Sequence, residues 1–265
     1  MIKFTCIAPH PPIIIPTIGK SQTSKAQATI EAMRKLRISL NRIRKTDKIF
    51  LISPHLPSTW DAFTLFYEET LKGSFADFGD SDTAFEFFAD RKTVDAIKIL
   101  GGPIFPIISA PIHYLDHGAL VPLYYLWDAG KHKTPLVPMS FCSLSLKDHY
   151  KFGLFLGEFF KQDKNNWSII ASADLSHRLT PAAPAGYSPS AKEFDRKLVQ
   201  FIKEKAIDKI LNFDVELVDE AGECGLRSIV LLLGIVSTFD WKPKILSYEA
   251  PFGVGYLVSE LKLGN

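Results

Sequence analysis

The sequence contains few cysteines and little excess charge. Its 265 residues include three cysteines, Cys6, Cys142 and Cys224, which cannot all pair and do not have the spacing of a zinc finger. We therefore expect a reducing compartment, the cytoplasm. The 31 basic and 29 acidic residues leave a net charge of +2. The chain thus lacks the strong field that attracts nucleic acids or anionic membranes, and we expect neither as a partner.

Long apolar runs are also lacking. The longest, such as residues 229–236, are too short to cross a bilayer, and Pro11 and Pro12 interrupt the apolar stretch near the start. We therefore expect no membrane span and no signal peptide. Without repeats or linkers, a chain of this length is expected to form one domain, residues 1–265. The sequence leaves the oligomeric state open, a homo-oligomer included.

Strand-like and helix-like segments alternate along the whole chain. We expect strands at residues 2–7, 48–53, 63–67, 84–89, 104–109, 135–141, 168–173, 244–250 and 254–261, and helices at 24–43, 91–100, 119–127, 146–161 and, as two or more, within 190–237. This alternation predicts an α/β fold in which a central mixed β-sheet is flanked by helices. Ligands of such sheets bind in a crevice at the carboxyl ends of strands.

Two histidines stand between prolines directly after a predicted strand. His10 lies in the stretch APHPP and His55 in PHLP. Proline fixes φ, restricts the residue before it and donates no backbone hydrogen bond, so each strand must stop there and each imidazole lies on a stiff loop. Either histidine alone suits a surface turn equally well. Together, at the same edge of one sheet, they could converge on a metal ion.

Three further histidines follow predicted strands. His113 and His117 come after residues 104–109, and His177 comes after residues 168–173. Each also suits a structural role: His113 in a turn, His117 at a helix entry, and His177 in a contact with the nearby aspartate. His132 and His149 lie among lysines and polar residues, on turns that we expect to face solvent.

A third metal ligand is expected from the stretch DEAGECGLR, residues 219–227. Glu223 lies between two glycines just before an apolar helix, so a flexible turn could deliver its carboxylate into the crevice. Cys224 is the competing ligand, and its soft thiolate suits zinc or copper better than iron that activates oxygen. Alternatively, Glu223 is one more solvated acid beside Asp219 and Glu220.

These residues give the chain a family resemblance. It resembles the class III extradiol ring-cleavage dioxygenases, the superfamily of protocatechuate 4,5-dioxygenase catalytic subunits, and the related Memo-like proteins. The similarity covers essentially the whole length. It is carried jointly, and in order, by PHPP at residues 9–12, SPH at 53–55, LDHGALVPL at 115–123, DLSH at 174–177 and ECG at 223–225.

The resemblance implies a site and a reaction. It implies a non-haem Fe(II) held by His10, His55 and Glu223, and the insertion of dioxygen into a catechol-type aromatic ring. A small aromatic diol and dioxygen would then be the partners of the protein. In Memo-like relatives a cysteine occupies the region of the third ligand, and Cys224 stands beside Glu223 here, so a branch whose dioxygenase chemistry is changed or lost is the alternative.

The resemblance also implies catalytic roles for histidines. His177 would be the acid/base residue, since an imidazole of pKa about 6.5 can both accept and return a proton at neutral pH. Asp174 or a nearby backbone carbonyl is expected to hold its ring. His117 would lie in the pocket for substrate and oxygen, with His113 as a helper. The remaining alternatives are a metal- or ligand-binding protein without ring cleavage, and a zinc-dependent hydrolase, since two histidines and a glutamate also suit zinc.

Overall fold

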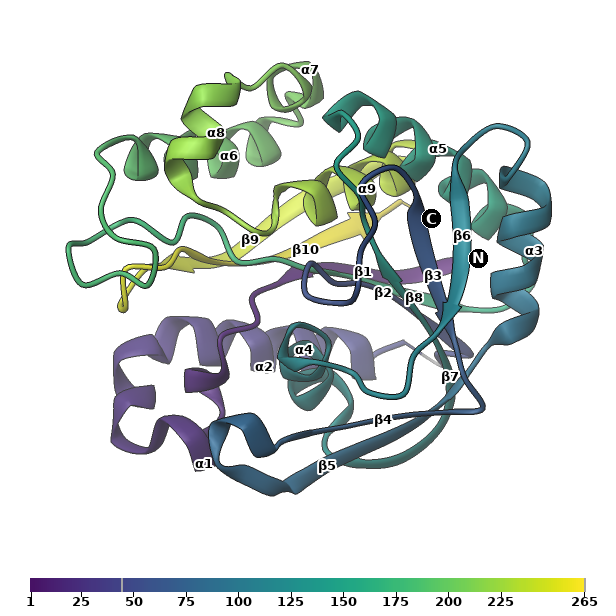
Figure 1. Cartoon of the computed structure of the whole chain (residues 1–265), viewed down its shortest axis with the longest axis horizontal. Helices are drawn as coiled ribbons and strands as arrows, with labels where there is room; N and C mark the ends of the chain where they lie inside the picture. Colours follow the sequence, from purple (N-terminus) through teal and green to yellow (C-terminus); the bar gives the residue numbers. More distant parts are fainter. Residues whose placement is uncertain (44, 265) are drawn as a thin grey trace.

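The strands of the computed structural model, which describes residues 1–43 and 45–264, form one sheet (Figure 1). The expected domain also includes Arg44 and Asn265, which lie outside the described residues. The strands are β1 (Ile2–Ala8), β2 (Lys48–Ile52), β3 (Phe63–Tyr67), β4 (Thr70–Phe75), β5 (Asp80–Ala89), β6 (Ile107–Pro111), β7 (Gly130–Ser140), β8 (Trp167–Ser172), β9 (Trp241–Glu249) and β10 (Tyr256–Leu263). The helices are α1 (Pro16–Gly19), α2 (Gln27–Asn41), α3 (Arg91–Gly101), α4 (His117–Trp127), α5 (Leu146–Gln162), α6 (Ser190–Glu204), α7 (Ile207–Leu211), α8 (Val215–Ala221) and α9 (Leu226–Ser237).

The sheet is mixed, as the sequence predicts. Its strand order is β4-β5-β7-β2-β8-β1-β10-β9, and β3 pairs with β6 and β7. The pairs β7–β2, β2–β8 and β8–β1 are parallel, whereas β10 is antiparallel to both β1 and β9. Parallel neighbours end at the same edge of a sheet. The loops that follow β1, β2 and β8 therefore meet.

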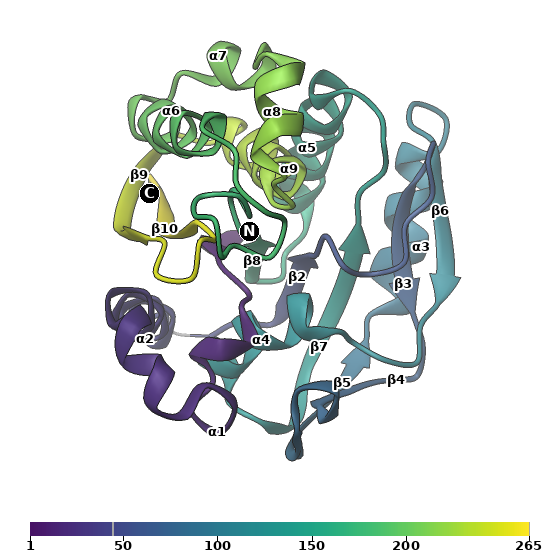
Figure 2. The ribbon, with the colours of Figure 1, turned by 60° about the vertical axis from the view of Figure 1, so that its left-hand side comes forward.

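Helices cover both faces of the sheet (Figures 1 and 2). On one face lie α2 and α4, and the amphipathic α2 turns its apolar stripe toward the sheet, burying Ile30, Met33, Leu36 and Leu40. On the opposite face lie α5 and α9. Residues 228–236 of α9 are all buried, because this helix is apolar on nearly every side. The core therefore consists of two apolar layers, one on each face.

Helices α5 and α9 run parallel and in close contact. A Cβ atom added at Gly153 of α5 would meet the carbonyl oxygen of Leu231, and one added at Gly157 would meet that of Ile235. Glycine permits this approach because it has no side chain. Since the contacts advance by four residues on both helices, their amino-terminal ends lie at the same end of the pair.

Several strands differ from their expected bounds: β5 begins four residues and β9 three residues earlier than expected, and β4 was not expected as a strand. β6 begins at Ile107, three residues later than expected, because the backbone N–H groups of Ile104 and Phe105 bond the carbonyl oxygen of Gly101 in a turn at the end of α3. β7 begins at Gly130, five residues earlier than expected, because its first residues pair with β5. A local turn thus shortens β6, whereas tertiary pairing overrides the apolar pattern in β7.

Candidate metal centre

Three imidazoles converge near the carboxyl ends of β1 and β2. His10 follows β1, His55 follows β2, and His117 is the first residue of α4. One ring nitrogen from each lies within 4.8 Å of the other two. The Nε2 atoms of His10 and His55 are 3.0 Å apart. Two nitrogen ligands about 2.1 Å from one metal ion, at a right angle, would be separated by about 3 Å. The pair of His10 and His55 therefore has the spacing of metal ligands.

The neighbours of His10 determine which of its ring nitrogens faces the other imidazoles. Its backbone N–H donates to Oδ1 of Asp174 at 2.9 Å, and Nδ1 lies 2.8 Å from the hydroxyl oxygen of Ser172. Ser172 uses its own proton to bond the carbonyl oxygen of Gly118, so its oxygen accepts the proton on Nδ1 of His10. The lone pair of the ring is therefore on Nε2, the nitrogen next to His55.

Burial keeps these imidazoles neutral at neutral pH. It lowers the pKa of His10 well below 6.5, and the neighbouring imidazole of His55 lowers that pKa further. Burial also lowers the pKa of His55 and lowers the pKa of His117 to about 4. Because the neutral ring is the form that binds metals, the three side chains are in the state that a metal site requires.

Cys224 brings a sulfur atom next to His10, although it does not belong to the group of three converging imidazoles. Its Sγ lies 3.5 Å from Nε2 of His10. A sulfur about 2.3 Å and a nitrogen about 2.1 Å from one tetrahedral metal ion would be about 3.6 Å apart. Burial raises the pKa of Cys224 well above its usual value and that of Asp174 to about 7. A bound cation would favour the ionised form of both groups, so the residues present fit a metal ion.

Glu223, the expected third ligand, is placed differently. Its Oε2 accepts a hydrogen bond from the backbone N–H of Leu226, the first residue of α9. This carboxylate satisfies a donor that the helix itself leaves free, and burial raises its pKa to about 7. It lines a second cavity, separate from the one that holds the imidazoles. The structure thus places Cys224, rather than Glu223, next to His10, and a ligand role for Glu223 remains a prediction.

His177 lies in the cavity of the imidazoles. It follows β8 and borders the same space as His10 and His55. Burial lowers its pKa, and its Nδ1 is buried without a hydrogen-bond partner among the described residues. Asp174, expected to hold this ring, instead accepts the backbone N–H of His10.

The remaining histidines lie outside this cavity. His113 is exposed on the surface, with Nδ1 3.4 Å from a carboxylate oxygen of Glu68. His132 is part of β7. The expectation that His149 faces solvent is wrong: it is fully buried in α5, with its ring edge-on to Phe63. The buried side of α5 carries His149 inward despite its polar neighbours in sequence.

The cavity has a volume of about 340 Å³ and mostly apolar walls, within the range of small-molecule sites. Beside the histidines and Asp174 it is lined by Pro11, Pro12, Ile13, Pro184, Phe252, Val254 and Tyr256. Phe78, in the short turn between β4 and β5, packs edge-on against His117 with ring centres 5.3 Å apart. This space suits a small, partly apolar molecule.

Two supporting residues escape prediction from the sequence. Ser172, which holds His10, ends β8 and lies directly beside Ala8, the last residue of β1. Phe78 reaches His117 because the β4–β5 hairpin folds toward α4. Both contacts depend on which strands are neighbours. Near these residues, the sequence pattern that indicated a site was DLSH, residues 174–177, which places Asp174 directly after a strand.

Fold and site together define a class: α/β proteins with a histidine-rich candidate metal centre at the carboxyl edge of a mixed sheet. More specifically, the chain belongs to the family of the catalytic LigB subunit of aromatic ring-opening dioxygenase, whose family model matches residues 4–259. This membership agrees with the resemblance seen in the sequence motifs.

Individual relatives extend the comparison. The chain is 32% identical, over 266 aligned positions, to Protein CA_C1420 of Clostridium acetobutylicum; the match covers 97% of this chain. The chain spans 56% of the length of that relative. Among solved structures, the uncharacterized protein JW3007 of Escherichia coli K12 has the same fold, with a TM-score of 0.70 and 16% identity, over 98% of this chain and 99% of that one. In the described part of the chain, no helix is both long enough and apolar enough to span a membrane.

Proposed function

We propose that this protein is a non-haem Fe(II)-dependent oxidoreductase that uses dioxygen to open the ring of a small aromatic diol. The observation that carries the proposal is the pair of neutral imidazoles, His10 and His55, whose Nε2 atoms are 3.0 Å apart at the edge of a mostly apolar cavity. Membership of a family of ring-opening dioxygenase subunits supports the reaction class.

The chain's own residues would hold and orient the metal. His10 and His55 would supply two nitrogen ligands, and Ser172 keeps the lone pair of His10 on Nε2. When bound, Fe(II) supplies positions at which a diol and dioxygen can meet. The apolar walls, Phe252 and Val254 among them, would exclude water and hold an aromatic ring flat.

His177 is the residue that we assign to proton transfer. It borders the cavity but does not belong to the group of three converging imidazoles. Because burial lowers its pKa, the ring is neutral at pH 7 and can accept a proton from a diol hydroxyl and later return it. His117, with Phe78 against its ring, would border the space for substrate and oxygen.

A second candidate function has a specific observation in its favour. The Sγ of Cys224 lies 3.5 Å from Nε2 of His10, and a thiolate ligand favours zinc or copper over Fe(II). A protein with this ligand set would be a Memo-like metal-binding protein in which ring cleavage is changed or lost. The choice between the two functions depends on the third donor.

Metal analysis and oxygen uptake test the proposal. Protein purified without oxygen should contain iron and consume oxygen when catechols are added. His55→Ala should lose both properties. His132→Gln, which changes a histidine outside the cavity, should keep both. Iron-loaded protein that consumes no oxygen with any catechol would refute ring opening, and tight retention of zinc or copper in its place would favour the second candidate.

A further inference from the structure

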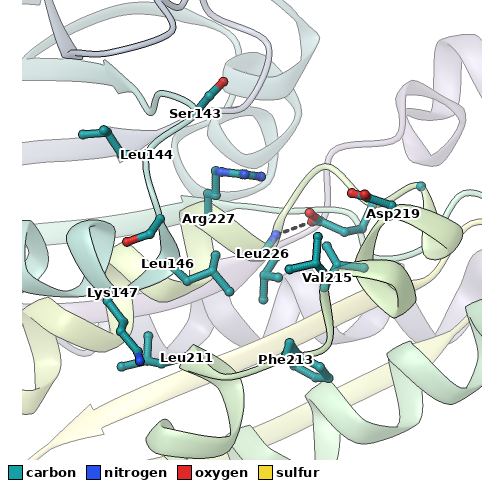
Figure 3. Close-up of a pocket in the computed structure, with 14 residues that line it drawn as sticks. Ser143, Leu144, Leu146, Lys147, Leu211, Phe213, Val215, Asp219, Leu226 and Arg227 are labelled. Carbon is teal, nitrogen blue, oxygen red and sulfur yellow. Dashed lines mark hydrogen bonds between the residues drawn. The ribbon is translucent and has the colours of Figure 1, made fainter.

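A second cavity lies on the other side of the turn that carries Cys224. It has a volume of about 530 Å³ and is formed by residues 143–147, by residues 211–219 and by the start of α9 (Figure 3). None of its lining residues borders the imidazole cavity. Its size is typical of sites for small molecules.

Two basic side chains line this cavity at the starts of two helices. Lys147 lies in the first turn of α5 and Arg227 in the first turn of α9. Because these helices run parallel, both present their amino-terminal, partly positive ends at this cavity. A cation in the first turn opposes the helix dipole. Both cations therefore lie at helix starts that are themselves partly positive.

Arg227 makes no direct polar contact within the described part of the chain, although its charge acts to lower the pKa of Glu223. The described residues offer its guanidinium no hydrogen bond, and none of their carboxylates makes a salt bridge with it; its Nε is buried and unpaired. Two acids, Asp219 and Glu223, line the same cavity. Glu223 is occupied by the backbone N–H of Leu226, and Asp219 is exposed at the rim. A half-buried guanidinium with free donors is suited to bind an anion.

The rest of the wall is apolar. In Figure 3 the guanidinium of Arg227 lies above Leu146 and Leu226, with Phe213 below them. The other apolar lining residues are Leu144, Leu211, Val215 and Val218. An ion of small size would leave this surface uncovered. An occupant with both an anionic group and an apolar body would cover it.

We propose that this cavity binds a small organic anion. The anionic group pairs with the guanidinium of Arg227, and an apolar or aromatic body packs on Leu146, Phe213 and Leu226. The site is distinct from the candidate metal centre and does not depend on the function proposed for it.

Titration calorimetry with three probes tests the proposal: phenylacetate, phenyl phosphate and the neutral phenylacetamide. We expect the full chain to bind at least one of the two anions and to bind phenylacetamide at least tenfold more weakly. Which anion binds more tightly distinguishes a carboxylate from a phosphate ligand. Arg227→Gln should weaken anion binding by about tenfold to hundredfold, the usual value of a charge-assisted contact.

Three further variants test whether the anion binds in this cavity. Phe213→Ala should also weaken binding, because it removes part of the apolar wall. Arg42→Gln, which removes an exposed arginine at the end of α2, should leave binding unchanged. His55→Ala, which disrupts the imidazole cavity, should leave it unchanged too. Binding that is lost in His55→Ala but kept in Arg227→Gln would overturn the proposal, as would the absence of anion binding.

Discussion

Cys224 and Glu223 are adjacent in sequence, yet they face different surroundings. The sulfur lies next to His10, whereas the carboxylate bonds the first N–H of α9. This division arises because successive residues of a turn project in different directions. The direction of each side chain, and not its position in the sequence, therefore decides which of the two residues is the third metal donor.

Metal retention in two variants should identify this donor. If Cys224 is the third donor, as in the second candidate function, Cys224→Ser should reduce the metal that remains after dialysis against a chelator by more than the roughly tenfold to hundredfold typical of supporting residues. Glu223→Gln should then retain the metal, because the amide oxygen can still accept from the backbone N–H of Leu226. Mass spectrometry of the metal content would provide the measurement. The reverse pattern would restore Glu223 as the ligand, as the family resemblance implies.

Substitution of His177 should separate chemistry from structure. His177→Gln is expected to keep metal content and melting temperature, because the ring bonds neither His10 nor His55. Turnover should fall by roughly 10²–10⁴-fold, the usual contribution of a general acid–base group. Single-turnover ring cleavage, metal content and melting should be measured on the same sample. Loss of metal or a collapsed melting curve would show that His177 supports the scaffold.

His149 should make stability depend on pH. Burial lowers its pKa from 6.5 to about 4, so between these values the unfolded chain binds more protons than the folded one. The stability of the folded state with a neutral, buried His149 is therefore fully present above about pH 6.5 and is lost as the pH falls toward 4. The loss amounts to about 3 kcal/mol at about 1.4 kcal/mol per pKa unit.

The test for His149 compares how steeply the free energy of unfolding falls with decreasing pH in two proteins. Urea unfolding of the wild type and of His149→Gln should be followed from pH 7 to pH 4. The variant should show a flatter decline in the free energy of unfolding, because its side chain does not titrate. Parallel curves would indicate that other groups cause the acid sensitivity.

At the scale of elements, the close approach of α5 and α9 brings the starts of both helices to the second cavity. Contact with α5 fixes the position of α9. The turn that precedes α9 is thereby fixed too, with Cys224 on one side of it and Glu223 on the other. A Cβ atom at Gly153 would lie 2.9 Å from the Cα of Gly234, which leaves no space for a methyl group.

Gly153→Ala should therefore destabilise the protein. Alanine in a free helix would be favoured over glycine by up to about 1 kcal/mol, but here overpacking should cost about 1–3 kcal/mol net. Lys151→Ala, on the exposed side of the same helix, serves as the control and should change stability little. Denaturant unfolding of both variants gives the comparison. A more stable Gly153→Ala would mean that the helices can separate without cost.

At the scale of the whole molecule, the candidate metal centre connects distant parts of the chain. His10 follows the first strand and Cys224 precedes the last long helix, so a bound ion would join residues more than 200 positions apart in sequence. A ligand that binds the folded state alone raises its stability. We propose that residues 1–265 unfold as one cooperative unit.

Metal addition should raise the melting temperature. At a free concentration 100 times the dissociation constant, the gain is about 2.7 kcal/mol, which corresponds to a shift of roughly 5–10 °C for a chain of this size. Calorimetry with and without Fe(II) or zinc would measure it. His55→Ala should show no such shift, and an equal shift in that variant would place the metal elsewhere.

Local sequence patterns sufficed to predict much of the fold and part of the site. Apolar runs stopped by prolines placed His10 and His55 after β1 and β2, because proline acts on its own neighbours in the chain. The alternation of strand-like and helix-like segments predicted the mixed sheet, because hydrophobic periodicity is also a local property of the sequence. The family resemblance, carried by ordered motifs, is confirmed by the family match.

Contacts between distant segments were decided by the tertiary structure. The order of strands placed Ser172 beside the end of β1 and gave Asp174 to His10 rather than to His177. The packing of α9 directed Glu223 to a helix end and left Cys224 beside the imidazole. The packing of α5 buried His149 against the rings of Phe63 and Phe141. No pattern within a few residues can determine these outcomes, because each depends on which elements pack together and at what angle.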